Sequence, residues 1–235
     1  MRFENKVAVV TGGAHGIGKC TCELFAKEGA KVCVIDLKEN PYFRGDLSKE
    51  EDIRRFAKKV LTEHGHVDYL INNAAPLMRG LTDGAAADMD YALKVGVTAP
   101  FLLTKLFREH FAPGASIVNI TSTRDSMSEP ETETYAAAKG AISALTHALS
   151  VTLAGVARVN AIAPGWIEVN GEEHSGPDAS QHPVKRVGMP EDVAEMVLFL
   201  CSDKASFITG ENIRIDGGMT RQMVYHGDGG WSYTE

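Results

Sequence analysis

The sequence predicts a single α/β domain built on a parallel β-sheet with helices on both faces. Short apolar runs alternate with longer amphipathic stretches along the chain, which is the pattern of repeated strand–helix–strand units. The short runs are continuously apolar, as expected for strands that are buried on both faces. A length of 235 residues without a break in composition fits one domain with a sizeable core.

In the first half of the chain, strands are expected at residues 6–10, 31–36, 42–47 and 68–71. A helix over residues 16–28 follows the first strand and ends at Gly29. A second helix over residues 48–64 is predicted to start at Ser48 as the N-cap, with Glu51 completing a capping box. Residues 87–111 are expected to form one or two helices.

In the second half, strands are expected at residues 116–120, 157–162 and 212–215, and a long helix at residues 134–153. Another helix over residues 190–201 has Pro190 in its first turn, where a missing N–H is tolerated. Residues 168–188 and 223–235 lack clear periodicity. Trp231 and Tyr233 in the second of these segments are expected to be disordered, or else to cover a neighbouring subunit's cleft.

Composition narrows the class of protein. The formal net charge of −7 argues against nucleic-acid and anionic-membrane partners. The four cysteines form no Cys-x-x-Cys pair, so buried or half-buried thiols are expected rather than disulfides or a metal site. No segment approaches the roughly 20 apolar residues of a membrane span, and the N-terminus has no signal-type stretch, so the expected location is the cytoplasm.

A glycine-rich turn follows the first strand. The segment from Thr11 to Gly18 carries spaced glycines at Gly12, Gly16 and Gly18. Glycines there let the backbone turn sharply and approach a pyrophosphate at the N-terminus of the next helix. An ordinary glycine-rich strand–helix turn is the alternative.

Asp36 ends the second strand, 18 residues after Gly18. A carboxylate there is placed to bind the adenosine ribose hydroxyls and to repel a 2′-phosphate, which favours NAD(H) over NADP(H). Leu37 in place of an arginine points the same way, whereas Lys38 and His15 leave NADP(H) open. Asp46 would suit an adenine amino group, or it is simply a turn residue.

Tyr135 and Lys139 lie four positions apart on one face of the predicted helix. A cation beside a phenol stabilises the phenolate and lowers its pKa toward the working range of an acid–base group. Ser122 lies thirteen residues earlier, at the end of a strand. Ligands gather beyond the carboxyl ends of parallel strands, where Gly12, Asp36 and Asn72 are also expected, so these side chains should meet.

These motifs together resemble the short-chain dehydrogenase/reductase family. The resemblance runs from about residue 5 to residue 220 and continues after Lys139 through four further segments: Asn160-Ala161-Ile162-Ala163-Pro164-Gly165, Arg186-x-Gly188-x-Pro190-Glu191-Asp192, Thr209-Gly210 and Asp216-Gly217-Gly218. It implies a Rossmann-like doubly wound sheet of about seven strands. Residues 1–220 would form the NAD(P)-binding domain with a substrate loop at 166–189, and residues 221–235 a C-terminal tail.

The resemblance also implies roles. Tyr135 would exchange a proton with the substrate oxygen, Ser122 would orient that oxygen, and Lys139 would bind the nicotinamide ribose. The implied cofactor-binding residues are Gly12, His15, Gly16, Ile17, Gly18, Asp36, Asp46, Leu47, Asn72, Ala74, Tyr135, Lys139, Pro164, Gly165 and Ile167. The implied activity is hydride transfer between NAD(H) and a secondary alcohol or ketone, without a metal.

The chain departs from the family pattern at three positions. Ala75, Gly96 and Val169 stand where the family usually has Gly, Asn and Thr. Because the family's Asn supports a proton relay to Lys139, a nucleotide-binding sensor or scaffold with weakened catalysis is the alternative function. The resemblance further implies a homotetramer, or a homodimer. Leu102, Leu106, Leu145 and Leu149 are apolar positions that suit either such an interface or the internal core.

Overall fold

Seven parallel strands form one sheet in the computed structural model, which describes residues 1–228 of the chain. The strands are β1 (Val7–Thr11), β2 (Lys31–Asp36), β3 (Phe43–Arg44), β4 (Val67–Asn72), β5 (Phe111–Ile120), β6 (Ala157–Pro164) and β7 (Asn212–Ile215). Their spatial order is β3-β2-β1-β4-β5-β6-β7, and every neighbouring pair is parallel. The predicted fold class is therefore confirmed.

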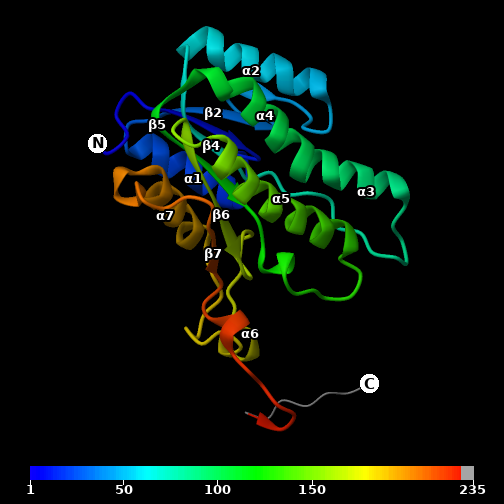
Figure 1. The fold of residues 1–235 in the computed structure, drawn as a ribbon. Helices are drawn as coiled ribbons and strands as arrows, with labels where there is room; N and C mark the ends of the chain where they lie inside the picture. The colour runs from blue at the N-terminus through cyan, green and yellow to red at the C-terminus, as the bar shows by residue number, and fades with distance from the viewer. Residues whose placement is uncertain (229–235) are drawn as a thin grey trace.

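Helices cover both faces of this sheet (Figure 1). On one face, α1 (Gly16–Lys27) packs against α7 (Pro190–Cys201). On the other face lie α2 (Glu50–His64), α4 (Ala99–Phe107) and α5 (Glu133–Thr152), with α3 (Ala86–Leu93) beside α5. Short 3-10 turns occur at Arg108–His110, Thr123–Asp125, Asp203–Ala205 and Met219–Arg221.

The side chains of the apolar strands contribute to two hydrophobic cores, one on each face of the sheet. Val9 of β1 belongs to the core under α2, α4 and α5, whereas its neighbour Val10 belongs to the core under α1 and α7. Ile117 and Val118 of β5 divide in the same way. Successive side chains of a strand point to opposite faces, so a sheet covered on both sides needs apolar residues at every position.

The sheet order reverses between β1 and β4. The chain leaves β1 for α1 on one face and leaves β4 for α3 and α4 on the other, so a crevice opens at the carboxyl ends of these two neighbouring strands. The glycine-rich turn lies at one lip of this crevice, and the segment after Asn72 lies at the other.

The structure corrects one local expectation and refines another. The capping box at Ser48 and Glu51 is wrong, because α2 begins at Glu50 and the side chain of its N-cap, Lys49, makes no capping hydrogen bond. Asp46 instead accepts the Ser48 N–H at 2.9 Å, and Asp52 accepts the Asp46 N–H at 2.9 Å. The predicted helical stretch at 87–111 is two helices joined by a π-helical segment, Lys94–Thr98, centred on Gly96.

The predicted substrate loop extends below the sheet and contains a short helix, α6 (Pro177–Ser180) (Figure 1). It lies beside the segment after β7, since the Val184 N–H donates to the Gly217 carbonyl at 3.2 Å. At its base, His174 Nε2 pairs with the buried Glu168 carboxylate at 2.6 Å. Trp231 and Tyr233 of the tail lie outside the described residues.

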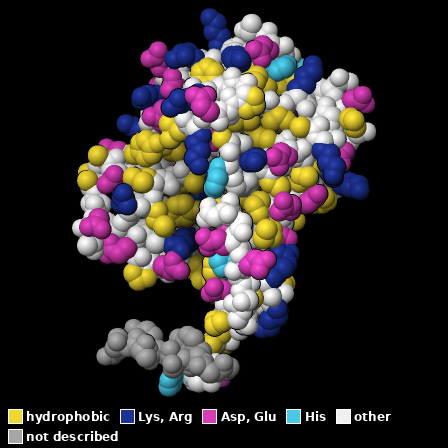
Figure 2. All heavy atoms as spheres, turned by 180° about the vertical axis from the view of Figure 1, so that it is seen from behind, with side chains coloured by type: hydrophobic (Ala, Val, Ile, Leu, Met, Phe, Trp, Pro, Cys, Tyr) yellow, Lys and Arg dark blue, Asp and Glu magenta, His cyan; other side chains and the backbone are white. Residues whose placement is uncertain are grey.

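The four cysteines, Cys20, Cys22, Cys33 and Cys201, are free thiols, buried or half-buried as expected. Burial raises their pKa values to about 11 for Cys20 and Cys33 and to about 12 for Cys22 and Cys201, so they stay protonated. Within residues 1–228, no helix combines the length and apolar character needed to cross a bilayer. Lys, Arg, Asp and Glu are interspersed on the face that Figure 2 shows.

Candidate active site

The glycine-rich turn has the conformation that its sequence predicts. Gly12 and Gly16 have φ values of +65° and +52°, which residues other than glycine rarely adopt. A Cβ at Gly18 would lie 2.1 Å from the Gly12 carbonyl oxygen, so only glycine allows α1 to pack this close to β1. Asn73, directly after β4, donates from Nδ2 to the Thr11 and Gly12 carbonyls at 3.0 and 2.9 Å and joins the two lips of the crevice.

Asp36 at the end of β2 is held by backbone donors. The Ala14 N–H donates to its Oδ2 at 3.0 Å, and the Lys38 N–H donates to its Oδ1 at 2.8 Å. The carboxylate is thereby fixed next to the glycine-rich turn.

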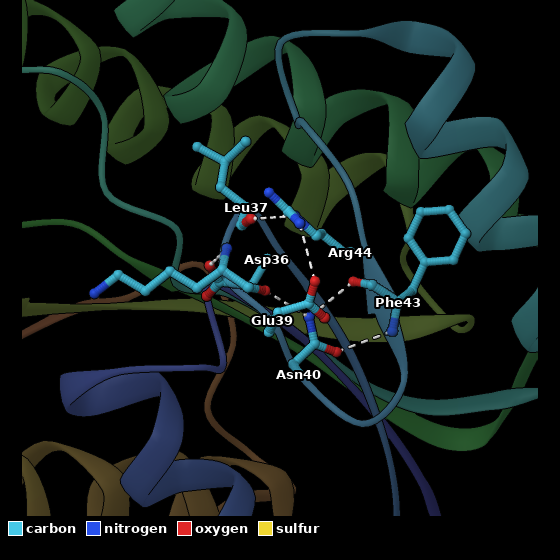
Figure 3. A network of polar contacts seen from close by, with 7 residues as sticks. Asp36, Leu37, Glu39, Asn40, Phe43 and Arg44 are labelled. Carbon is cyan, nitrogen blue, oxygen red and sulfur yellow. Dashed lines mark hydrogen bonds and ion pairs between the residues drawn. The ribbon is translucent and has the colours of Figure 1, made fainter.

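The segment after Asp36 is pinned by its own side chains, as Figure 3 shows. Arg44 donates from Nε to the Leu37 carbonyl at 3.0 Å and pairs with Glu39 at 2.9 Å. Asn40 bridges the Lys38 and Phe43 carbonyls. The positive charge of Arg44 is thus balanced by Glu39 rather than free for a ligand.

Ser122, Tyr135 and Lys139 come together at the ends of β5 and β6. Lys139 on α5 is buried; its Nζ donates to the Ile120 carbonyl at 2.6 Å and lies 5.3 Å from the centre of the Tyr135 ring. Ser122 accepts the Arg124 N–H at 3.2 Å, and its side chain also forms a hydrogen bond with Tyr135.

Burial is the largest influence on the pKa values of Tyr135 and Lys139. It raises the pKa of Tyr135, although a hydrogen bond with Ser122 and the charge of Arg124 act in the opposite direction. Burial also lowers the pKa of Lys139 to about 7. The lowering of the Tyr135 pKa that was expected from Lys139 does not appear in the protein alone, because the ammonium is itself destabilised.

The start of α5 is anchored to the segment after β4. Thr134 donates its hydroxyl to the Leu77 carbonyl at 2.9 Å and accepts the Arg79 N–H at 2.8 Å. Glu131 accepts both the N–H and the hydroxyl of Thr82 at 2.9 Å. These bonds fix Tyr135, the next residue after Thr134.

Two adjoining cavities meet at these side chains. The first, called the long groove, has a volume of about 560 Å³ and runs from Asp36 to Lys139. Most of the predicted site residues line it: Gly12, His15, Gly16, Ile17, Asp36, Leu47, Ala74, Ser122, Tyr135, Lys139, Pro164, Gly165 and Ile167. The second, called the side cavity, has a volume of about 580 Å³ and shares Ser122, Tyr135, Gly165 and Ile167 with the groove.

Three predicted residues are absent from the walls of the long groove. Gly18 packs against Gly12, and Asp46 serves the turn before α2. Asn72 is buried and donates to Asn119 of β5 at 2.8 Å, which places it in the sheet. The turn reading of Asp46 is therefore the one the structure favours.

Several residues that line the two cavities were not predicted from the sequence. Tyr91 and Val95 reach the long groove from α3 and the π-helical segment, with no local signal to mark them. Arg124 and Glu129 line the side cavity from the segment between Ser122 and Tyr135. Their position between two predicted catalytic residues is a sequence signal for a place near the substrate. Gln181 and Met219 join them from distant loops that only the fold brings close.

The three positions that differ from the family pattern lie close to the predicted site. A Cβ at Gly96 would lie 3.1 Å from the Ala138 Cβ, directly before Lys139. Val169 lines the long groove and packs over Gly16. Ala75 lines the same groove.

A parallel sheet with a glycine-rich turn at its switch point, joined to a serine, a tyrosine and a lysine, defines a nucleotide-binding α/β enzyme with acid–base groups. Residues 12–220 match the family model described as enoyl-(acyl carrier protein) reductase. An uncharacterized oxidoreductase of Thermotoga maritima is 37% identical over 95% of this chain and 99% of its own length.

Further similarities agree. An NAD-dependent glycerol dehydrogenase of Listeria innocua is 35% identical over 92% of this chain and 94% of its own. The solved structure of an apo SCOR enzyme from Clostridium thermocellum superposes with a TM-score of 0.92 at 43% identity, covering 98% and 99% of the two chains. The chain belongs to the short-chain dehydrogenase/reductase family and is an oxidoreductase.

Proposed function

We propose that this protein is an NAD(H)-dependent oxidoreductase that interconverts a secondary alcohol and a ketone, with Tyr135 as the acid–base group. The observation that carries the proposal is the position of Ser122 and Tyr135 on the walls of both cavities. One cavity can hold the cofactor and the other the substrate, so that the reacting atoms meet beside the phenol.

The long groove fits a dinucleotide. A pyrophosphate would lie against the bare backbone at Gly12 and Gly16, where α1 begins. The Asp36 carboxylate would bind the adenosine ribose hydroxyls and repel a 2′-phosphate, which supports NAD(H). The relative named an NAD-dependent glycerol dehydrogenase supports the same choice.

When bound, the nicotinamide would accept the hydride of the alcohol or return one to the ketone. Tyr135 would take the hydroxyl proton as the alcohol is oxidised and return it in the reverse reaction. Ser122 would hold the substrate oxygen, since its own oxygen already accepts from Arg124. Lys139 would bind the ribose hydroxyls, and these acceptors would favour its ammonium form, which brings positive charge to the phenol.

Replacing Tyr135 tests this proposal. Tyr135→Phe is expected to lower kcat roughly 100- to 10,000-fold with little change in NADH affinity. Alcohol oxidation needs the phenolate, whose pKa burial raises, so its rate should increase as pH rises; ketone reduction needs the phenol and should slow. NADH absorbance would be followed in both directions, and an unchanged kcat in Tyr135→Phe would refute the assignment.

The alternative of a weakened nucleotide-binding sensor or scaffold is not favoured, because the relatives named above are oxidoreductases and dehydrogenases. The proposal includes a cytoplasmic location, without a metal, nucleic acid or membrane partner. It also includes assembly as a homotetramer, or a homodimer.

A further inference from the structure

The walls of the side cavity carry information about the substrate. The cavity lies beside Ser122 and Tyr135 on the side away from Asp36. A molecule there would present one of its carbons to these two side chains and the rest of its structure to the remaining walls. The chemistry of those walls therefore indicates the class of substrate.

Among the described residues, two charged side chains line this cavity, and their charges are opposite. Arg124 forms an ion pair through Nη2 with the Glu129 carboxylate. The Arg124 side chain is 27% exposed and Glu129 is 71% exposed, so the pair lies at the open side of the cavity. A ligand with net negative charge would have to displace Glu129, and a cation would meet Arg124.

The other walls combine neutral polar groups with one aromatic face. Ser128 and Gln181 supply groups that both donate and accept hydrogen bonds. The Trp166 ring is supported by His174, with ring centres 4.8 Å apart. A flat aromatic wall combined with strong donors and acceptors complements a molecule that has C–H faces between hydroxyl groups.

We propose that the substrate is a neutral polyhydroxylated molecule, a polyol or a sugar, whose hydroxyl groups bind the Arg124–Glu129 pair. A hydroxyl accepts from the guanidinium and donates to the carboxylate, so adjacent hydroxyls use both charges without separating them at a cost. The inference rests on the proposed function: the oxidised carbon gives its hydride to NAD⁺ and its hydroxyl proton to Tyr135, which leaves a carbonyl group.

Removing one charge distinguishes a polyol or sugar from an anionic substrate, because KM should change in opposite directions for the two classes. Glu129→Gln removes the acceptor that a polyol uses, so KM for a polyol or sugar is expected to rise at least 10-fold with kcat within a few fold. For a hydroxy acid, the same change removes a competing carboxylate and lowers KM. Glu133→Gln, an equal charge change on an exposed residue nearby, should leave both constants unchanged.

A second variant guards against a local folding effect. Arg124→Gln should also raise KM for the polyol. It should also shift the rise of the oxidation rate with pH to higher pH, because the charge of Arg124 lowers the pKa of Tyr135. A purely structural role would not move this rise. Melting temperatures equal to that of the wild type would show that both variants fold.

The experiment compares wild type and variants with NAD⁺ over polyols, aldoses, their deoxy analogues, hydroxy acids and simple secondary alcohols. Turnover of polyols or aldoses, weaker with the deoxy analogues and sensitive to Glu129→Gln, supports the inference. Turnover confined to hydroxy acids or simple alcohols overturns it and leaves the proposed function standing. An absence of turnover with every class, in protein that binds NADH, overturns both.

Discussion

At the scale of single residues, burial governs the chemistry of the site. Lys139 has one backbone partner, the Ile120 carbonyl, and burial lowers its pKa to about 7. Tyr135 is shifted toward its neutral form by the same cause. The pKa values of both groups therefore depend on their buried surroundings, as is common for side chains that exchange protons in active sites.

Asp36 is the residue that we expect to select the cofactor. Asp36→Ala removes charge-assisted hydrogen bonds to the ribose, about 1.5–3 kcal/mol, so the dissociation constant for NADH should rise roughly 10- to 100-fold. It also frees the Ala14 and Lys38 N–H groups, which can then bind a 2′-phosphate, so NADPH should bind more tightly than to the wild type. Fluorescence titration measures both constants.

Glu109→Ala is the matched control, because this carboxylate is 85% exposed, is paired with Arg108, and lies in the 3-10 turn before β5, away from Asp36. It should leave the affinities for NADH and NADPH unchanged. Equal affinities of wild type and Asp36→Ala for both cofactors would contradict the assignment.

At the scale of elements, the π-helical segment decides what Gly96 does. The segment brings the Gly96 backbone against Ala138 of α5 and Pro76 after β4. A Cβ at this position would lie 3.1 Å from the Ala138 Cβ, so a side chain here, such as the family's Asn, requires α5 to shift slightly. The position thus affects Lys139 through the placement of α5.

Two glycine-to-alanine changes should have opposite effects. Gly96→Ala overpacks the contact with α5 and should destabilise the fold by about 1–3 kcal/mol and lower turnover. Gly140→Ala on α5 meets nothing closer than 3.9 Å and should stabilise the helix by up to about 1 kcal/mol. Thermal denaturation gives both signs, and a Gly96→Ala variant as stable as the wild type would refute the packing argument.

The base of the predicted substrate loop depends on an ion pair. The Glu168 carboxylate and Asp178, 3.7 Å from Nδ1, raise the pKa of His174, and His174 lowers the pKa of Glu168. The stabilisation from His174 is complete below its ordinary pKa of 6.5 and is lost as pH rises through the raised value. The stabilisation from Glu168 is present above 4.5 and is lost as pH falls through the lowered value.

The loop should therefore become more mobile as pH rises from mildly acidic to alkaline. Hydrogen exchange in residues 166–189, corrected for the intrinsic rate, should increase across that range, while α2 stays unchanged. His174→Gln should abolish the increase, and His110→Gln, an exposed site elsewhere, should not. A pH-independent loop in the wild type would contradict this role for the pair.

At the scale of the whole molecule, the helices α4 and α5 serve the core first. Leu102 and Leu149 are buried in the core, and Leu106 and Leu145 pack against it. Phe101 and Val151 on the same helices are 49% and 77% exposed. On these two helices, Phe101 and Val151 are therefore more exposed to another subunit than the four leucines.

The expected assembly can be measured directly. Light scattering at micromolar concentration should give the mass of a tetramer, or of a dimer, and Phe101→Glu should lower that mass because it places a charge in an apolar contact. Thr62→Glu on α2, an exposed polar site, is the control. A monomeric wild type would overturn the assembly.

The features that the sequence alone determined are local ones. Strand and helix order follows from apolar periodicity, the turn at Gly12 and Gly16 from the need for positive φ, and the candidates Ser122, Tyr135 and Lys139 from their spacing. Asp36 is identifiable from the sequence as a cofactor-binding candidate because it ends a predicted strand.

Only the tertiary structure decided the features that depend on distant segments. It gave Asn72 and Asp46 hydrogen-bond partners within the fold, replaced the predicted cap of α2, and brought Gln181 and Met219 to the cavity of Arg124 and Glu129. Such contacts depend on strand order and on how loops close over the sheet. These are non-local quantities to which neighbouring residues along the chain give no periodic signal.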